Sequence, residues 1–280
     1  MSLAEKGQRF RDLHARDTAF VIPNPWDIGT ARIFAALGFE ALATTSAGLA
    51  FGLGRQDAKG AVRRDEVLAH IAEIAGATDL PVSADLENGF GDAPETAAET
   101  IALAAGAGMV GGSIEDATGN PEAPIYDFDH AVERVAASVE AARKAPHPFM
   151  MTARAENYLY GRRDLDDTIR RLQAFEAAGA DVLYAPGLRD IGDIRTLCAA
   201  LSKPVNVVMG IAGAEISVDE LSAAGVKRIS VGSALARAAL GEVLRAATEI
   251  KEKGTFTWGA RAASFAELNA VMSDRAPAAD

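Results

Sequence analysis

Short runs of apolar, β-branched residues alternate with longer alanine-rich segments along most of this chain. The short runs predict eight strands, over residues 20–22, 40–45, 80–86, 108–115, 148–154, 180–185, 204–208 and 227–231. The alanine-rich segments predict helices over residues 27–37, 62–77, 93–106, 127–144, 164–178, 189–201, 217–224 and 233–253. An amphipathic pattern over 3–16 predicts one more helix before the first strand.

Turn signals mark the passages from helix to strand. The segments A-L-G-F-E, A-G-A-G-M, A-A-G-A-D and A-A-G-V-K each place glycine where a helix is expected to end. Strands that alternate with helices are parallel, and an uninterrupted series of eight predicts a closed (β/α)8 barrel, with an open doubly wound sheet as the alternative. No linker rich in glycine, serine or proline interrupts the series, so we expect one domain over 1–280.

The chain continues beyond the eighth unit. Residues 255–272 predict an extra C-terminal helix with four large apolar side chains to bury, those of Phe256, Trp258, Phe265 and Leu268. The tail 274–280 is expected to be frayed.

Composition narrows the class of protein. The chain has 280 residues, of which 49% are hydrophobic, enough to bury a large core. Its net charge of −11 disfavours binding to nucleic acid or to anionic membranes. No segment resembles a signal peptide or a membrane span, so a cytoplasmic location is expected. Cys198 is the only cysteine, which excludes an internal disulfide and a cysteine-based zinc site.

Two acids mark the end of the third predicted strand. Asp85 and Glu87 are two residues apart, so in an extended chain both carboxylates project from one face. Magnesium prefers oxygen ligands and is commonly held by one or two carboxylates together with substrate oxygens. The pair therefore predicts a site for a hard cation, with two solvated acids as the alternative.

Other strand ends carry polar residues too, and function in a barrel belongs to these ends. The candidates are T-T-S-A-G (44–48), Asp57, Glu115, Asp116, Arg154 and Asn206. Each alone has an ordinary structural explanation as an ion pair, a turn cap or a loop acid. Together, the four acids at strand ends (Asp85, Glu87, Glu115 and Asp116) and an arginine at one end of a barrel indicate a cation and an anionic substrate.

Six motifs resemble those of the isocitrate lyase / phosphoenolpyruvate mutase superfamily. They are N-P-W-D-I-G-T-A-R (24–32), T-S-A-G (45–48), G-R-Q-D (54–57), A-D-L-E-N-G-F-G (84–91), S-I-E-D (113–116) and T-A-R-A-E (152–156). The resemblance extends from about Phe20 to beyond Leu240. It implies a TIM barrel of the phosphoenolpyruvate mutase type that binds Mg²⁺, with Mn²⁺ as an alternative ion, and a small α-oxo acid.

The resemblance also implies roles for individual residues. Asp85 would be the main metal-side acid, with Glu87 and Glu115 completing the metal site largely through water. Arg154, Asp57 and Glu115 would be the catalytic residues, Asp57 by supporting the metal's waters. The substrate would be held by Ser46, Ala47, Gly48, Arg154, Asn120 and Asn206. Exchange of the C-terminal helix between subunits of a homotetramer is implied as well.

The sequence departs from the superfamily in the loop after the fourth predicted strand. Isocitrate and methylisocitrate lyases carry a catalytic cysteine there in a Lys-Lys-Cys-Gly-His loop, whereas residues 116–126 contain no cysteine, lysine or histidine. Glu87 also stands where aspartate is usual, and Asn120 matches an asparagine of the phosphonate-forming members.

We therefore expect a Mg²⁺-dependent lyase that cleaves or decarboxylates a small α-oxo or 2-hydroxy acid such as oxaloacetate. Three alternatives stay open. A mutase or hydrolase could act on the P–C bond of phosphonopyruvate through the same enolate, or the protein could bind α-oxo acids without catalysis. The small-residue segments 210–215 and 231–237 also suit a phosphate-binding barrel, which would not need the cluster of acids.

Overall fold

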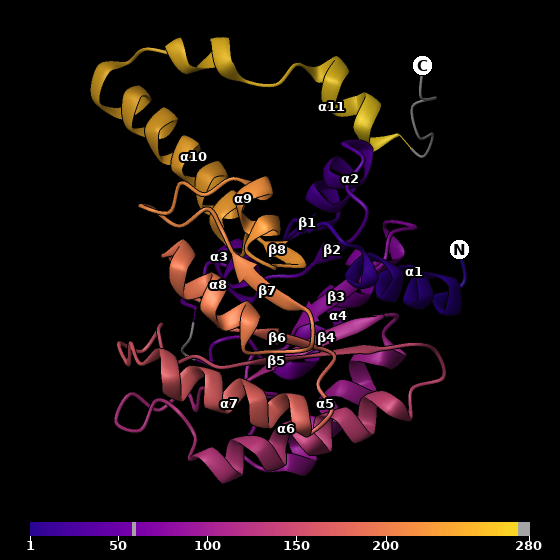
Figure 1. The fold of residues 1–280 in the computed structure, drawn as a ribbon. Helices are drawn as coiled ribbons and strands as arrows, with labels where there is room; N and C mark the ends of the chain where they lie inside the picture. The colour runs from indigo at the N-terminus through magenta and orange to yellow at the C-terminus, as the bar shows by residue number, and fades with distance from the viewer. Residues whose placement is uncertain (58–59, 274–280) are drawn as a thin grey trace.

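The computed structural model describes residues 1–57 and 60–273, and its centre is a barrel of parallel strands (Figure 1). The strands are β1 (Phe20–Ile22), β2 (Leu42–Ala43), β3 (Val82–Asp85), β4 (Gly111–Glu115), β5 (Met150–Arg154), β6 (Val182–Tyr184), β7 (Val205–Val208) and β8 (Arg228–Ser230). Their order is β1-β8-β7-β6-β5-β4-β3-β2, and every pair is parallel. A hydrogen bond from the Ala43 amide to the Pro23 carbonyl (3.1 Å) joins the chain after β1 to β2. The barrel expected from the sequence is confirmed, and the open sheet is excluded.

Helices follow the strands around the barrel. They are α1 (Leu3–Ala15), α2 (Ile28–Ala36), α3 (Ser46–Gly52), α4 (Arg64–Gly76), α5 (Pro94–Gly106), α6 (Phe128–Arg143), α7 (Leu165–Ala177), α8 (Ile191–Ala199), α9 (Val218–Ala223) and α10 (Ala234–Lys253). Helix α3 was not predicted, and β2 is shorter than the expected strand 40–45. The cause is Thr45, whose hydroxyl accepts a hydrogen bond from the Gly48 amide (3.3 Å) and caps α3 where the sequence suggested strand.

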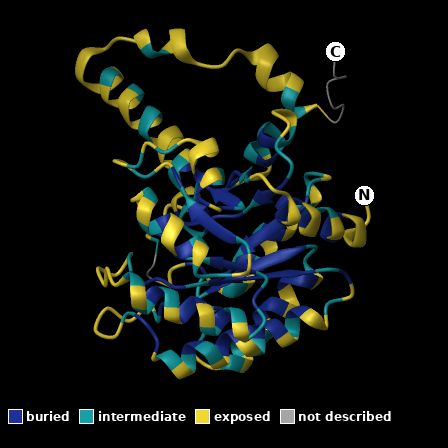
Figure 2. Ribbon diagram, viewed as in Figure 1, coloured by how far each residue is buried: buried dark blue, intermediate teal, exposed yellow. Residues whose placement is uncertain are grey.

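Helix α1 closes the barrel at the amino ends of the strands. Phe10 and Leu13 of α1 are fully buried, and they pack in one cluster with Phe20, Met150 and Val182 of the barrel interior. A larger core lies between the strands and the surrounding helices, where buried residues gather in Figure 2. With the amino end plugged by apolar side chains, the carboxyl ends of the strands are the open end.

The C-terminal segment departs from the prediction of one continuous helix over 255–272. A 3-10 turn (Thr257–Arg261) comes first, and a separate helix, α11 (Phe265–Met272), begins at a capping box formed by Ser264 and Glu267. Helix α11 reaches α2, where Arg32 donates a hydrogen bond to the Met272 carbonyl (2.8 Å). Residues 274–280, expected to be frayed, lie outside the described residues.

We call residues 234–272 the C-terminal arm, which projects from the barrel in Figure 1. Of the four large apolar side chains expected to be buried, Trp258 is half-buried and the other three are exposed in this single chain. The exposed large apolar side chains of the arm are Leu235, Leu240, Val243, Leu244, Ile250, Phe256, Phe265 and Leu268. Among the described helices, including those of the arm, none combines the length and the apolar character needed to cross a membrane.

Candidate active site

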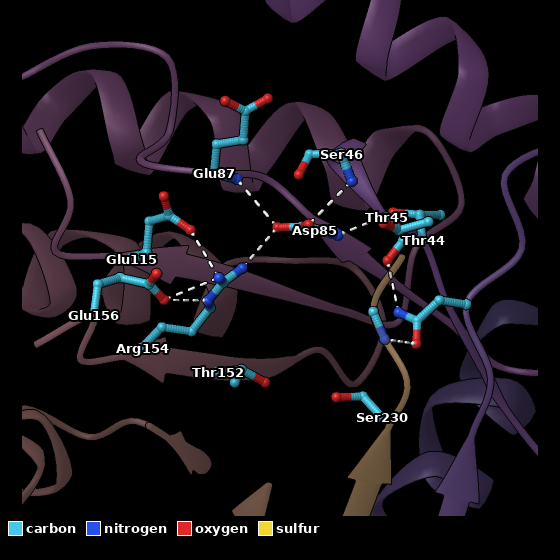
Figure 3. A network of polar contacts seen from close by, with 12 residues as sticks. Thr44, Thr45, Ser46, Asp85, Glu87, Glu115, Thr152, Arg154, Glu156 and Ser230 are labelled. Atoms are coloured by element: carbon cyan, nitrogen blue, oxygen red, sulfur yellow. Dashed lines mark hydrogen bonds and ion pairs between the residues drawn. The ribbon is translucent and has the colours of Figure 1, made fainter. Parts of the chain in front are cut away.

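Asp85 and Arg154 meet at the carboxyl end of the barrel (Figure 3). Each is the last residue of its strand, β3 and β5 respectively. Their side chains form an ion pair of 3.0 Å between Arg154 Nη1 and Asp85 Oδ1, and each is less than one-fifth exposed. Two of the residues predicted to form the site, Asp85 and Arg154, are thus partners.

The chain after β2 fixes the position of Asp85. Its backbone amide donates to the Thr44 hydroxyl (3.0 Å), and its Oδ2 accepts from the Ser46 amide at the start of α3 (3.1 Å). Asn24 supports this segment by donating to the Thr44 carbonyl (2.9 Å) while its own carbonyl oxygen accepts from the Val231 amide (2.9 Å). Three other segments of the chain, at residues 24, 44–46 and 231, therefore fix the position of Asp85.

Arg154 is surrounded by two further carboxylates. Glu115, at the end of β4, lies 3.1 Å from Nη2, and Glu156 accepts from Nε at 2.9 Å. Burial is the largest cause of the raised pKa values of both Glu115 and Glu156, and Arg154 partly opposes it. Glu156 belongs to the motif T-A-R-A-E, but the sequence did not predict a role for it. Its spacing of two from Arg154 was the available signal.

Glu87 occupies a strained position beside this group. Its backbone φ is 49°, in the left-handed region that residues with a side chain seldom adopt. The pKa of Glu87 is raised to about 7, first by burial and then by the negative charges of Asp85 and Asp57. Strain and charge repulsion at one residue indicate a functional rather than a structural role.

The acids of the site are of the type that binds a divalent cation, but they do not by themselves form a complete set of metal ligands. Over residues 1–57 and 60–273, no three His, Cys, Asp or Glu side chains converge closely enough to hold an ion. The donor set nevertheless fits a hard cation, because the four carboxylates of Asp85, Glu87, Glu115 and Glu156, of which Glu156 is buried and the others partly buried, outnumber the single guanidinium of Arg154. Such a set suits an ion that keeps several waters, which is the coordination that Mg²⁺ prefers.

A cavity of about 250 Å³ opens beside the Asp85–Arg154 pair. Among the residues predicted to form the site, Ser46, Ala47, Asp57, Asp85, Arg154 and Asn206 line this cavity. Gly48 is buried and does not line it, because its amide is used to cap α3. Glu87 and Glu115 line a neighbouring cavity together with Thr118 and Gly119 of the 116–126 loop.

Asn120 is not brought to the site. It lies exposed on the 116–126 loop, where its side-chain oxygen accepts from the Glu122 amide (3.0 Å), and it lines neither cavity. Arg171 of α7 anchors both ends of this loop, through Asp116 (3.2 Å) and the Tyr126 carbonyl (3.1 Å). A role for Asn120 in substrate binding stays a prediction that needs movement of the loop tip.

Cys198 takes no part in the site. It lies on α8 beside Gly225, away from both cavities, and burial raises the pKa of its thiol to about 11. A thiol with such a pKa is not a nucleophile or acid near neutral pH.

Comparisons with known proteins agree with the geometry. Residues 10–251 match the family model of phosphoenolpyruvate phosphomutase. A solved structure from Burkholderia cenocepacia J2315, named only at the level of a lyase or mutase, is 61% identical with a TM-score of 0.93, and the match covers 95% of each chain. A probable 2-methylisocitrate lyase of Corynebacterium glutamicum is 30% identical, over 91% of this chain and 85% of its own. The structure of oxaloacetate acetylhydrolase with oxalate is 25% identical with a TM-score of 0.84, covering 96% of this chain and 93% of that one.

Proposed function

Since the chain belongs to the phosphoenolpyruvate phosphomutase family of lyases and mutases, we propose that it is a Mg²⁺-dependent carbon–carbon lyase. Its substrate would be a small α-oxo or 2-hydroxy carboxylic acid of the oxaloacetate kind, which it would cleave or decarboxylate. The observation that carries the proposal is the ion pair between Asp85 and Arg154 at the mouth of the cavity. In this pair, Asp85, the acid on the metal side, directly contacts Arg154, which would donate to a substrate oxygen.

Asp85, Glu87 and Glu115 are the residues that would hold the cation, directly or through water. When bound, Mg²⁺ would neutralise negative charge that develops on the oxo oxygen as the adjacent bond breaks. Mn²⁺ has similar oxygen preferences and is an alternative ion. Asp57 lines the same cavity and lies close enough to Glu87 to raise its pKa, as expected of a residue that supports the metal's waters.

Arg154 would donate to the substrate oxygen that becomes an enolate. Its guanidinium is held from three sides by Asp85, Glu115 and Glu156, so its donors are oriented before the substrate arrives. The segment at Ser46 and Ala47 would receive the substrate carboxylate at the start of α3 through the Ala47 amide, because the Ser46 amide donates to Asp85. In a decarboxylation the bond to the departing carboxylate breaks, CO₂ leaves, and the enolate takes a proton from water to become the oxo acid.

The reaction is tested by incubating the protein and Mg²⁺ with oxaloacetate and measuring pyruvate above the metal-only background. Arg154→Lys keeps the charge but loses the planar donors, and it should lower kcat/KM by about 100-fold or more. Arg195→Met is the matched control, because Arg195 lies exposed on α8 outside both cavities. EDTA should abolish turnover; equal turnover of the parent and Arg154→Lys would refute the role of Arg154.

A second candidate is cleavage or rearrangement of the P–C bond of phosphonopyruvate. Its support is that Gly210, Ser233 and Arg237, from the small-residue loops after β7 and β8, line the same cavity. Release of phosphate from phosphonopyruvate without turnover of any carboxylic acid would establish it in place of the lyase. Binding of both substrates without product would instead support a binding protein for α-oxo acids.

We also propose that the protein is a homotetramer in which subunits exchange their C-terminal arms. The support is the row of exposed apolar side chains along α10 and α11 in the single chain. A monomer seldom exposes so many large apolar residues on one segment.

A further inference from the structure

Arg228 lies deep in the barrel, at the floor of the cavity that Asp85 and Arg154 border. It is the first residue of β8, and only 5% of its surface is exposed. Its Nε donates to the Asn206 side-chain oxygen (2.8 Å), and its Nη2 donates to the Thr152 hydroxyl (3.1 Å). The third nitrogen, Nη1, has no partner among the described residues.

No carboxylate of the described chain pairs with Arg228. This separates it from Arg154, which has three carboxylate partners. Burial is the main reason that the pKa of Arg228 is lowered to about 10, and the positive charge of Arg154 adds to the effect. A buried cation without a counter-charge is unfavourable. An anion that enters the cavity would therefore compensate the charge of Arg228.

Two serine hydroxyls at the same floor also lack partners. Ser83 is 4% exposed and Ser113 is 9% exposed, both line the cavity, and neither hydroxyl makes a hydrogen bond within the described residues. Ser113 is the register neighbour of Thr152, which accepts a hydrogen bond from Arg228. Neighbouring strands are about 4.8 Å apart, so Ser113 lies on the strand beside the residue that Arg228 contacts.

The floor lies one layer of side chains beneath the proposed metal site. Thr152 precedes Arg154 by two residues on β5, which is roughly 7 Å along a strand, and Figure 3 shows Thr152 below Arg154. The two carboxylates of a four-carbon dicarboxylate are closer together than this distance, and the hydrogen bonds that each would accept, about 2.8 Å long, add the remainder. Such a ligand could occupy the upper layer with one end and the floor with the other.

We propose that Arg228, with Ser83 and Ser113, binds the second carboxylate of a four-carbon 2-oxo or 2-hydroxy dicarboxylate and thereby selects dianionic substrates. This assignment deepens the proposed function, on which it relies for the position of the first carboxylate. Arg228 is a specificity-determining residue in this scheme, because it contacts the carboxylate at the end of the substrate that the metal does not chelate.

Calorimetric titration with malate and 2-hydroxybutyrate in the presence of Mg²⁺ tests the assignment. The two acids share four carbons and the 2-hydroxy acid end, and they differ in whether C4 is a carboxylate or a methyl group. The parent should bind malate at least about 30-fold more tightly than 2-hydroxybutyrate, since a buried charge-assisted pair is worth 2 kcal/mol or more. Arg228→Met should lose that preference while keeping its affinity for 2-hydroxybutyrate, and Arg228→Lys should retain part of it.

Arg195→Met, which removes an exposed arginine, is the control and should behave as the parent. A parent without preference for malate would overturn the assignment even if Arg228→Met failed to fold. Equal losses for both ligands in a folded Arg228→Met would overturn it too, because they would mark Arg228 as a structural residue. Selective binding without any turnover would leave the assignment supported and reject the lyase reaction, so the two failures are distinguishable.

Discussion

His14 should make this protein sensitive to acid. It lies on α1 at the closed end of the barrel and is 3% exposed, with its Nδ1 2.7 Å from the Phe10 carbonyl. Its Nε2 has no partner among the described residues, and its ring packs edge-on against Phe10 and Phe20. The pKa of His14 is lowered from 6.5 to about 3. Burial is the main cause, and the Arg228 cation contributes in the same direction. The folded protein therefore keeps this histidine neutral in a range of pH where the unfolded chain protonates it.

The size of the effect follows from that difference in pKa. Below 6.5 the unfolded state gains a proton that the folded state does not bind until the pH reaches about 3, so the free energy of unfolding falls as the pH falls. The loss is roughly 1.36 kcal/mol per pH unit within this window, or about 2.7 kcal/mol over two units. Above 6.5 the contribution is constant.

Urea unfolding of the parent and of His14→Gln, each at about pH 7.5 and about pH 4.5, measures this contribution. Glutamine can donate to the Phe10 carbonyl and does not titrate, and carboxylates elsewhere affect both proteins alike, so they cancel in the difference. The parent should lose about 2 to 3 kcal/mol more than the variant between the two pH values. Equal losses would show that His14 is not held neutral by the fold, and the reasoning would be refuted.

Other predictions concern the site and the arm. Asp85→Ala should abolish calorimetric Mg²⁺ binding and turnover while leaving the melting temperature unchanged or higher, and equal Mg²⁺ affinities would contradict its assignment. Gly48→Ala would place a Cβ 2.6 Å from Thr45 Cγ2, so it should cost about 1–3 kcal/mol in urea unfolding and raise KM more than a Gly52→Ala control on the exposed end of α3 alters it. The absence of a thiol in 116–126 should make the protein a poor methylisocitrate lyase, by roughly 10²–10⁴-fold; robust release of pyruvate from methylisocitrate would contradict this. Leu244→Glu should reduce the oligomer seen in sedimentation, and a monomeric parent would contradict exchange of the arm.

Most of the fold could be predicted because a parallel barrel repeats one local pattern. Strand β1 and the cores of the other strands were located from their apolar runs, and glycines marked the helix ends. Helix α3 was missed because its start depends on the hydroxyl of Thr45, a residue that favours strands by composition. The break at Ser264 was missed for a similar reason, since the apolar pattern continues across it while a capping box restarts the helix.

The site was predicted in part for an equally physical reason. Residues at strand ends converge in any barrel, so the meeting of Asp85, Glu115 and Arg154 followed from topology. The environment of Arg228 could not be predicted, because whether a buried cation has a partner depends on side chains from β5 and β7 that are distant in sequence. The exposed position of Asn120 depends on how a variable loop folds, which no strand pattern determines.

Arg154 and Arg228 lie in opposite electrostatic environments within the barrel. In the upper layer, three carboxylates contact Arg154, and burial, together with neighbouring negative charges, raises the pKa values of Glu87, Glu115 and Glu156. In the lower layer, no carboxylate of the described residues pairs with Arg228, and burial lowers the pKa of its guanidinium. A cation above and an anionic group below would relieve both at once, and a dicarboxylate chelated at one end supplies the second part.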